Sequence, residues 1–149
     1  MEQTLVIIKP DGVRRHLVGK ILQRFEDKNL KIAALKYSYL TKEAVEEHYA
    51  HLKSRPFFPE LIAYMTSGPV VCLVLESPAV IAIVRQLLGA TQATAAVPGT
   101  IRGDYAMAGT ENVVHASDSP AAAQAEIKRF FGEHYHVEET GPRFMKPAL

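Results

Sequence analysis

The run PVVCLVLES at residues 69–77 restricts the fold more than any other stretch of this sequence. Apolar side chains occupy every position from Val70 to Leu75. Because successive side chains of a strand point to opposite faces, a strand of this composition must be covered on both sides. The chain therefore needs a sheet with a layer of other elements on each face. Its 149 residues are enough for one such domain.

Three other stretches predict strands. QTLVIIK, residues 3–9, is rich in β-branched side chains and stops at the turn signal PDG, residues 10–12. In LKYSY, residues 35–39, apolar and polar side chains alternate, as they do on a half-buried strand. NVVHA, residues 112–116, predicts a last short strand that ends in small polar residues. With the apolar run, these stretches make a four-stranded sheet.

Apolar residues recur with the spacing of a helix face in the stretches between the strands. These stretches are Val18 to Phe25, Lys42 to Leu52, Leu61 to Met65, Val80 to Leu88 and Ala123 to Phe131. Thr41 and Ser119 stand where helix N-caps are expected, and Pro120 follows at a first helical position. From Gly89 to Asn112 the periodicity disappears, which predicts a long functional loop.

The alternation of strands and helices predicts an α/β sandwich in a single domain, residues 1–149, for which a split β-α-β sheet is one arrangement.

Basic and acidic side chains nearly balance, 17 against 16, so we expect no dedicated binding of nucleic acid. Cys72 is the one cysteine, which fits a reducing compartment. No leader or bilayer-spanning run is visible, so we expect a cytoplasmic protein without a membrane anchor.

Phosphate binding by a glycine-rich loop is not indicated, because neither GxxxxGK[ST] nor GxGxxG occurs. Side chains would have to bind phosphates instead. The candidates are Lys9 at a strand end, Arg55 before a proline, Arg85 and Arg102. By position alone Arg85 resembles an ordinary solvated helix residue, whereas Arg102 lies among turn residues and has the geometry that suits phosphate oxygens.

His115 is the histidine with the most informative surroundings. It ends a strand, and Ser117 follows two residues later on the same side of an extended chain. Glu126 stands in the next helix and could hold one ring nitrogen, which would leave the other as a nucleophile. His134 and His136 near the C-terminus read as surface residues. A structural role for His115 remains the alternative at this point.

The chain resembles the nucleoside diphosphate kinase family along most of its length. The family's signature N-x-x-H-[small]-S-D-[SG] stands here as NVVHASDS. IKPDGV, HYAHLKSRPFF, SGPV and PGTIRGD precede it in the family's order and spacing. The resemblance implies a ferredoxin-like fold of the α+β class, with a four-stranded antiparallel sheet covered by helices. It also implies ping-pong transfer of a γ-phosphate from a nucleoside triphosphate to a diphosphate, which maintains nucleotide pools.

The resemblance also implies roles for matching positions. His115 would be the nucleophile, oriented by Glu126 and Ser117, and Tyr49 would support it from the wall of the site. The nucleotide would be held by Lys9, Phe57, Leu61, Arg85, Thr91, Arg102 and Asn112. Mg²⁺ would be bound mainly through the nucleotide phosphates rather than by a protein metal site.

Partners implied by the resemblance are ATP, other nucleoside di- and triphosphates, and further copies of the chain in a tetramer or hexamer built from dimers. Three positions depart from the family pattern. Ala116 replaces a common glycine, a common proline is missing from TQATAAV at 91–97, and Gly109 leaves one side of the base site open.

Two other functions fit parts of the sequence. A regulatory domain would bind a nucleotide or an amino acid without chemistry, and a histidine phosphatase would pass the phosphate to water. Phosphatases of that kind usually carry an RHG motif, which this sequence lacks.

Overall fold

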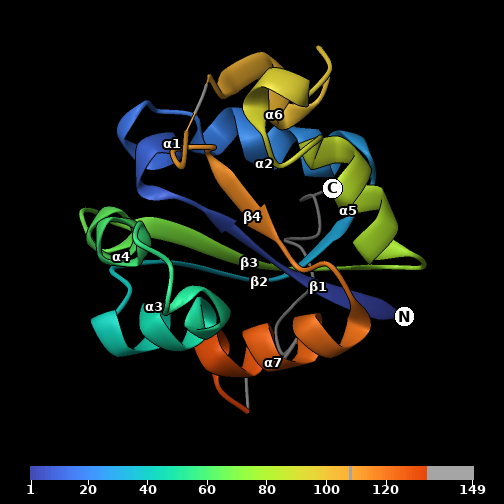
Figure 1. Ribbon diagram of the computed structural model, residues 1–149. Coiled ribbons are helices and arrows are strands. Elements are labelled where there is room, and N and C mark those ends of the chain that lie inside the picture. Colours follow the sequence, from blue (N-terminus) through green and yellow to red (C-terminus); the bar gives the residue numbers. More distant parts are fainter. Residues whose placement is uncertain (108, 134–149) are drawn as a thin grey trace, which may run out of the picture.

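The computed structural model describes residues 1–107 and 109–133, and these form a sheet with helices on both faces (Figure 1). The predicted positions His134 and His136 lie outside the described residues. The strands are β1 (Glu2–Ile8), β2 (Lys31–Ser38), β3 (Val70–Ser77) and β4 (Val114–Ala116). The α-helices are α1 (Pro10–Arg14), α2 (Val18–Asp27), α3 (Lys42–His48), α4 (Phe58–Met65), α5 (Val80–Leu88), α6 (Ile101–Tyr105) and α7 (Pro120–Phe131). Two short 3₁₀ helices are η1 (Ala50–Leu52) and η2 (Ala93–Ala95).

The strand order is β2-β3-β1-β4, and all three pairings are antiparallel. This confirms the predicted four-stranded antiparallel sheet of the α+β class. The apolar run 70–75 is strand β3, which lies inside the sheet with β1 and β2 as neighbours and is buried on both faces. Within residues 1–107 and 109–133, β4 pairs with β1 alone and forms one edge, and Ile7 stands opposite His115 in that pairing.

Two hydrophobic cores lie on opposite faces of the sheet. Val6 and Ile8 of β1 face the core built with α2, α5 and α6, whereas Leu5 and Ile7 face the core built with α3, α4 and α7. Figure 1 shows α7 and α3 below the sheet and α2 and α5 above it. The predicted covering of the apolar strand on both sides is thus confirmed, because a layer of helices packs on each face of the sheet. None of the described helices combines the length and the apolar character that crossing a bilayer requires.

The structure corrects three local predictions. PDG at 10–12 is the first turn of α1 rather than a simple turn, because Pro10 at the helix start fits a position that needs no N–H donor. The segment from Gly89 to Asn112 is not a loop throughout, since it contains η2 and α6. Both helices are too short to produce a periodic pattern.

The third correction concerns the face of β2 that is buried. Leu35, Tyr37 and the following Tyr39 are 48%, 62% and 70% exposed, so the predicted apolar face points outward. The register of β2 against β3 shifts between Ile32 and Ala34. The alternation at 35–39 lies wholly after this shift, so it separates the two faces of β2 without showing which one packs against the core.

Candidate active site

His115 reaches the site from β4, the shortest strand, and a constrained turn sets where that strand begins. Val113 has a φ of 74°, which is costly for a β-branched residue, and it is fully buried. The Val114 N–H donates to the Asn112 carbonyl over 2.8 Å, so the turn is a γ-turn centred on Val113. The Val113 carbonyl in turn accepts from the Lys9 N–H, also at 2.8 Å. The backbones that carry Lys9 and His115 are therefore joined.

Gly12 makes this close approach possible. A Cβ at that position would come within 2.9 Å of Ile8 Cγ2 and 3.2 Å of Val113 Cγ1. No side chain fits there without moving its neighbours. The glycine of KPDG and the valine before the signature histidine thus belong to one packed unit, although about 100 residues separate them.

Two groups hold Glu126 against the ring of His115. His115 Nε2 lies 2.6 Å from Glu126 Oε1, and Ser117 Oγ donates to the same oxygen over 3.0 Å. Ser117 is itself fixed, because its Oγ accepts from the Leu5 N–H. Burial alone would raise the pKa of Glu126, but the hydrogen bonds from His115 and Ser117 hold it below its usual value. A carboxylate only accepts, so Nε2 carries the proton and the Nδ1 lone pair is left for chemistry.

Lys9 follows the end of β1 and is buried, with its Nζ donating to Asn112 Oδ1 over 2.6 Å. Burial, and after it the positive charge of Arg102, lower the pKa of Lys9 to about 8, while Asp11 opposes the shift. Asn112 Nδ2 donates to the Thr91 carbonyl at 3.0 Å. Lys9, Asn112 and Thr91 thus form a continuous chain of contacts along one wall.

Arg102 is 3% exposed and lies in α6, not in the loop that the sequence predicted. Its guanidinium donates to the carbonyls of Gly89, Asn112 and Val114 at 3.0, 3.4 and 2.7 Å. Burial, and then the charge of Arg85, lower its pKa to about 10, so it stays charged at neutral pH. An arginine has five N–H donors, and two of those of Arg102 remain for a ligand.

Arg24 of α2 holds α6, the helix that carries Arg102, in place. One of its guanidinium nitrogens donates to the Gly99 carbonyl at 2.9 Å, and another donates to Asp104 Oδ2 at 2.5 Å. Thr100 caps α6 by accepting from the Gly103 N–H. The position of Arg102 thus depends on residues of a helix that is distant in the sequence.

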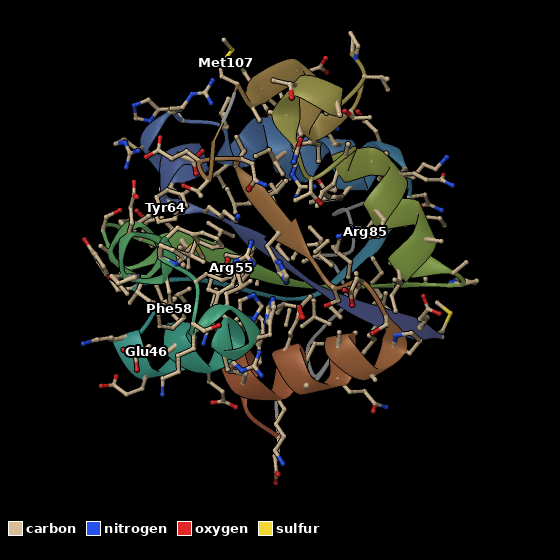
Figure 2. The ribbon with its side chains drawn as sticks, viewed as in Figure 1. Glu46, Arg55, Phe58, Tyr64, Arg85 and Met107 are labelled. Carbon is tan, nitrogen blue, oxygen red and sulfur yellow. The ribbon has the colours of Figure 1, made fainter. Side chains whose placement is uncertain are left out.

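Arg85 lies on the side of α5 that faces β4, and Figure 2 shows it between these elements. Its Nη1 donates to the Ala116 carbonyl at 3.3 Å. The interpretation of Arg85 as a solvated helix residue is therefore wrong, because its guanidinium reaches the strand of His115.

Two adjoining cavities bring the predicted residues together. One, of about 650 Å³, is lined by His115, Glu126, Arg85 and Arg102, and the other, of about 520 Å³, by hydrophobic Phe57 and Leu61 with Gly109. Both are lined by Lys9, Tyr49, Thr91 and Asn112. Burial, and then the charge of Glu126, raise the pKa of Tyr49, so its hydroxyl stays protonated. Of the predicted site residues, all but Ser117 line one of these cavities.

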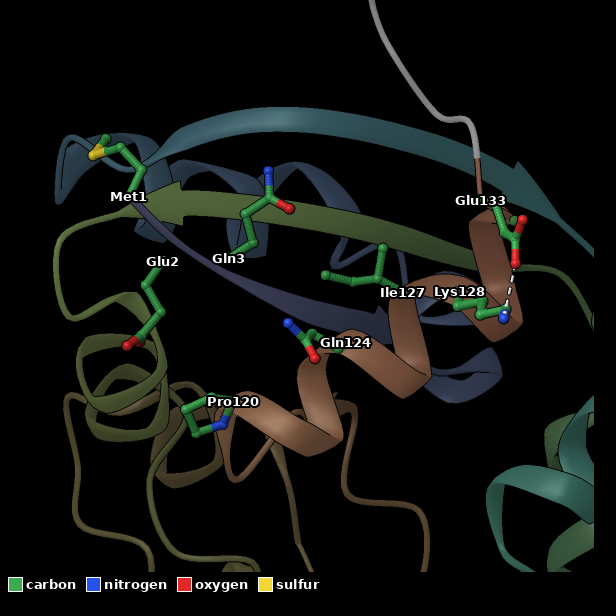
Figure 3. Close-up of a pocket in the computed structure, with 9 residues that line it drawn as sticks. Met1, Glu2, Gln3, Pro120, Gln124, Ile127, Lys128 and Glu133 are labelled. Atoms are coloured by element: carbon green, nitrogen blue, oxygen red, sulfur yellow. Dashed lines mark ion pairs between the residues drawn. The ribbon is translucent and has the colours of Figure 1, made fainter.

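Another cavity, of about 460 Å³, lies between the start of β1 and α7 (Figure 3). Gln3, Gln124 and Ile127 are among its lining residues, and the ion pair between Lys128 and Glu133 spans 2.8 Å at its end. No predicted site residue contributes to it.

Sequence reasoning missed His48 and Arg129, which both line the larger cavity. The rings of His48 and His115 meet edge to face, with centroids 4.6 Å apart. Arg129 stands three residues after Glu126, and that spacing in a predicted helix was an available signal that both share a face. His48 gave no such signal, because only the fold brings it to His115.

His48, His115 and Glu126 form a possible metal-ligand group within the described part of the chain, with ligand atoms within 4.8 Å of one another. The cations that line the same cavity, namely Lys9, Arg85, Arg102 and Arg129, disfavour a metal ion there. We assign no metal to these three residues.

Comparison with known proteins gives one consistent family. The family model described as nucleoside diphosphate kinase matches residues 2–136. A nucleoside diphosphate kinase from Thermus thermophilus is 56% identical over 131 residues, which is 88% of this chain and 96% of that protein. One from Thermoplasma acidophilum is 51% identical over 137 residues, which is 92% and 93% of the two chains.

Solved structures agree. The apo nucleoside diphosphate kinase of Encephalitozoon cuniculi superposes with a TM-score of 0.87 at 44% identity and covers 89% of this chain and 90% of its own. The Halobacterium salinarum enzyme, solved in complex with CDP, gives a TM-score of 0.85 at 45% identity, with 87% of each chain covered.

Proposed function

The chain belongs to the nucleoside diphosphate kinase family, and we propose that His115 is the residue that carries the phosphoryl group. As a member, it is an enzyme that moves the γ-phosphate of a nucleoside triphosphate to a nucleoside diphosphate by a ping-pong mechanism through a phosphohistidine. We further propose that ATP is the usual donor.

One observation carries the assignment of His115. Its Nε2 is bound to Glu126 Oε1 while the ring lines the cationic cavity, so Nδ1 is the available nucleophile. Nδ1 attacks the γ-phosphorus, the bond from that phosphorus to the β–γ bridging oxygen breaks, and the diphosphate leaves. The phosphorylated ring is cationic while Nε2 keeps its proton, and the Glu126 carboxylate compensates that charge. A second diphosphate then reverses the step with its own terminal oxygen.

The cations of the larger cavity fit the triphosphate. Lys9 would contact the transferred phosphoryl group and, with Asn112, the sugar hydroxyl. Arg85 and the two unused N–H donors of Arg102 would hold phosphate oxygens, with Thr91 beside them. Because phosphoryl transfer depends mainly on positioning and charge neutralisation, these side chains supply most of what the step needs.

The second cavity fits a base. Phe57 lies on its wall half-buried, with the Arg55 guanidinium 5.8 Å from the centre of its ring, and Leu61 is nearby. Such a wall offers a stacking surface without hydrogen-bond donors matched to one base. We therefore propose low selectivity among bases, with Gly109 leaving one side of the cavity open.

Mg²⁺ fits this site only as a companion of the nucleotide. The described carboxylates that line this cavity are Glu126, which is already hydrogen-bonded, Glu47, whose Oε1 lies 3.4 Å from Arg129 Nε, and the exposed Asp118. The other charged side chains near the predicted phosphate site are cations that would bind phosphate oxygens directly. When bound through the phosphates, Mg²⁺ would neutralise charge on the leaving diphosphate.

We also propose that the chain forms a homo-oligomer, a tetramer or hexamer of dimers, and that residues 1–149 act as one domain. The apolar outer side of edge strand β2, at Leu35 and Tyr37, supports self-association, because exposed edges with apolar side chains favour pairing. The buried Cys72 thiol fits a cytoplasmic location.

Labelling with γ-labelled ATP and Mg²⁺, without acceptor, tests the assignment. We expect acid-labile, alkali-stable label on the wild type that moves to added GDP, and none on His115→Ala. His16→Asn is the matched control, since His16 is exposed and has a positive φ that asparagine tolerates. Normal turnover of His115→Ala would overturn the mechanism. ATP binding without labelled protein would favour the regulatory domain, and label released to water the phosphatase.

A further inference from the structure

His48, the last residue of α3, lies at the centre of a group of rings beside the proposed nucleophile. Its centroid is 4.6 Å from those of Tyr49 and His115 and 5.3 Å from that of Phe130. All three contacts are edge to face, and the angle with His115 is 85°. His48 is thus a buried wall against the ring of His115.

The polar partner of His48 is Arg129 of α7. Arg129 Nη1 lies 3.1 Å from His48 Nδ1. A guanidinium only donates, so Nδ1 of His48 must accept and its ring proton must be on Nε2. Burial, and then the electrostatic effect of the neighbouring His115, lower the pKa of His48 to about 3, with Arg129 and Lys9 acting in the same direction and Glu126 opposing them. The ring therefore stays neutral, in one tautomer.

Arg129 of α7 also forms an ion pair with α3, although its Nε makes no hydrogen bond with any described residue. Its side chain is 15% exposed, and its Nε lies 3.4 Å from Glu47 Oε1 at the end of α3. Glu126 precedes it by three residues on α7. One helix thus contacts the nucleophile in two ways: Glu126 binds a nitrogen in the plane of the His115 ring, and Arg129 binds the ring that rests on it.

We propose that Arg129 is a positioning residue, which fixes the tautomer and orientation of His48 and through it the orientation of the His115 ring for phosphoryl transfer. This inference rests on the proposed role of His115. A nucleophile that can rock about its bond to Glu126 spends less time in line with the γ-phosphorus. A fixed neighbouring ring restricts that motion without adding a charge beside a ring that becomes cationic.

The variants Arg129→Met and Arg129→Lys separate the hydrogen bond from packing. Methionine keeps an unbranched stem but removes every donor, whereas lysine keeps a donor. The readout is the single-turnover rate of His115 phosphorylation by γ-labelled ATP with Mg²⁺. We expect Arg129→Met to slow this rate by about 3- to 10-fold, the range for one lost hydrogen bond, with the ATP KM changed by less than about 2-fold. Arg129→Lys should recover most of the rate.

A measurement on the wild type needs no variant. Nitrogen-15 spectra of the histidine rings should show His48 as a single neutral tautomer protonated on Nε2, and a tautomer mixture in Arg129→Met. A proton on Nδ1 of the wild-type ring would overturn the proposal. So would wild-type rates in Arg129→Met, or equal slowing in both variants with a matching fall in melting temperature. Failure of the wild type to become labelled would instead refute the role of His115.

Discussion

β2 and β4 are the two edges of one sheet, but β2 runs for eight residues and β4 for three. β2 has an extended surface with exposed Tyr37, whereas β4 begins at the constrained turn of Val113 and is tied to Lys9 and Arg102. The comparison indicates that the length of an edge strand says little about its role. The proposed chemistry is at the short edge, where backbone carbonyls are already bound, and the proposed assembly surface is at the long one.

Replacing Lys9 gives the largest effect expected at the short edge. Lys9→Met should lower kcat/KM by about 10²- to 10³-fold, the usual loss for one charge that stabilises a transition state. Since the pKa of Lys9 is about 8, its charged fraction decreases as pH rises through 8. Wild-type kcat/KM should therefore fall above about pH 8, and Lys9→Met should lack this alkaline limb. With ATP as the donor, CDP is a suitable acceptor for the pH series, because its product differs from the donor and cytosine loses no proton in this range. A limb that persists in Lys9→Met would contradict the assignment.

The backbone strain at Val113, in the turn before β4, can be tested through the stability of variants. Gly and Ala differ by about 0.5–1 kcal/mol in favour of Ala at ordinary backbone positions, but a positive φ costs alanine about 1–2 kcal/mol. Changing alanine to glycine lowers the free energy of unfolding at an ordinary position such as 114. At position 113 the same change should lower it by about 1–2 kcal/mol less, because glycine relieves the strain of the positive φ. Val114 is equally buried and has no positive φ, so it is the matched control. Urea unfolding of the four variants measures both changes, and equal changes would mean that the turn carries no strain.

A substitution on β2, the long edge strand, should change the oligomeric state rather than the turnover rate. Tyr37→Lys places a charge on the exposed side of β2, which opposes pairing of edges. We expect a lower mass by analytical ultracentrifugation and activity per chain within about 2-fold of wild type. An unchanged mass would place the assembly surface elsewhere on the molecule.

Long periodic elements could be predicted from the sequence, because eight or more residues average out local exceptions. The run 70–77 and the helix at 80–88 were correctly placed for this reason. α1 and α6 have five residues each, about one turn and a half, so their pattern could not be separated from that of a turn. The exposed face of β2 was missed because the alternation at 35–39 separates the two faces of a strand but does not show which face packs against the core.

The candidate site could be located through short motifs, but its internal contacts could not. The signature around His115 and the resemblance of the chain led to the residues that line both cavities. The contact between His48 and Arg129 joins positions 81 residues apart, and no local pattern encodes it. The three carbonyls that Arg102 binds were also invisible, because they are backbone groups whose positions depend on the complete fold.

The bond from Arg102 to the Gly89 carbonyl has a consequence for how this chain can diverge. A Cβ at Gly89 would lie 2.4 Å from Thr100 Oγ1. Gly89 and Thr100, which flank the segment 90–99, are therefore in close contact. Lengthening a segment whose ends are already closed costs only about 0.6 kcal/mol for each doubling of its length. Insertions at residues 95–96, after the residues 91–94 that line the two cavities, should therefore be tolerated during evolution without displacing the site. This short stretch is a natural place for lineages to acquire new surfaces.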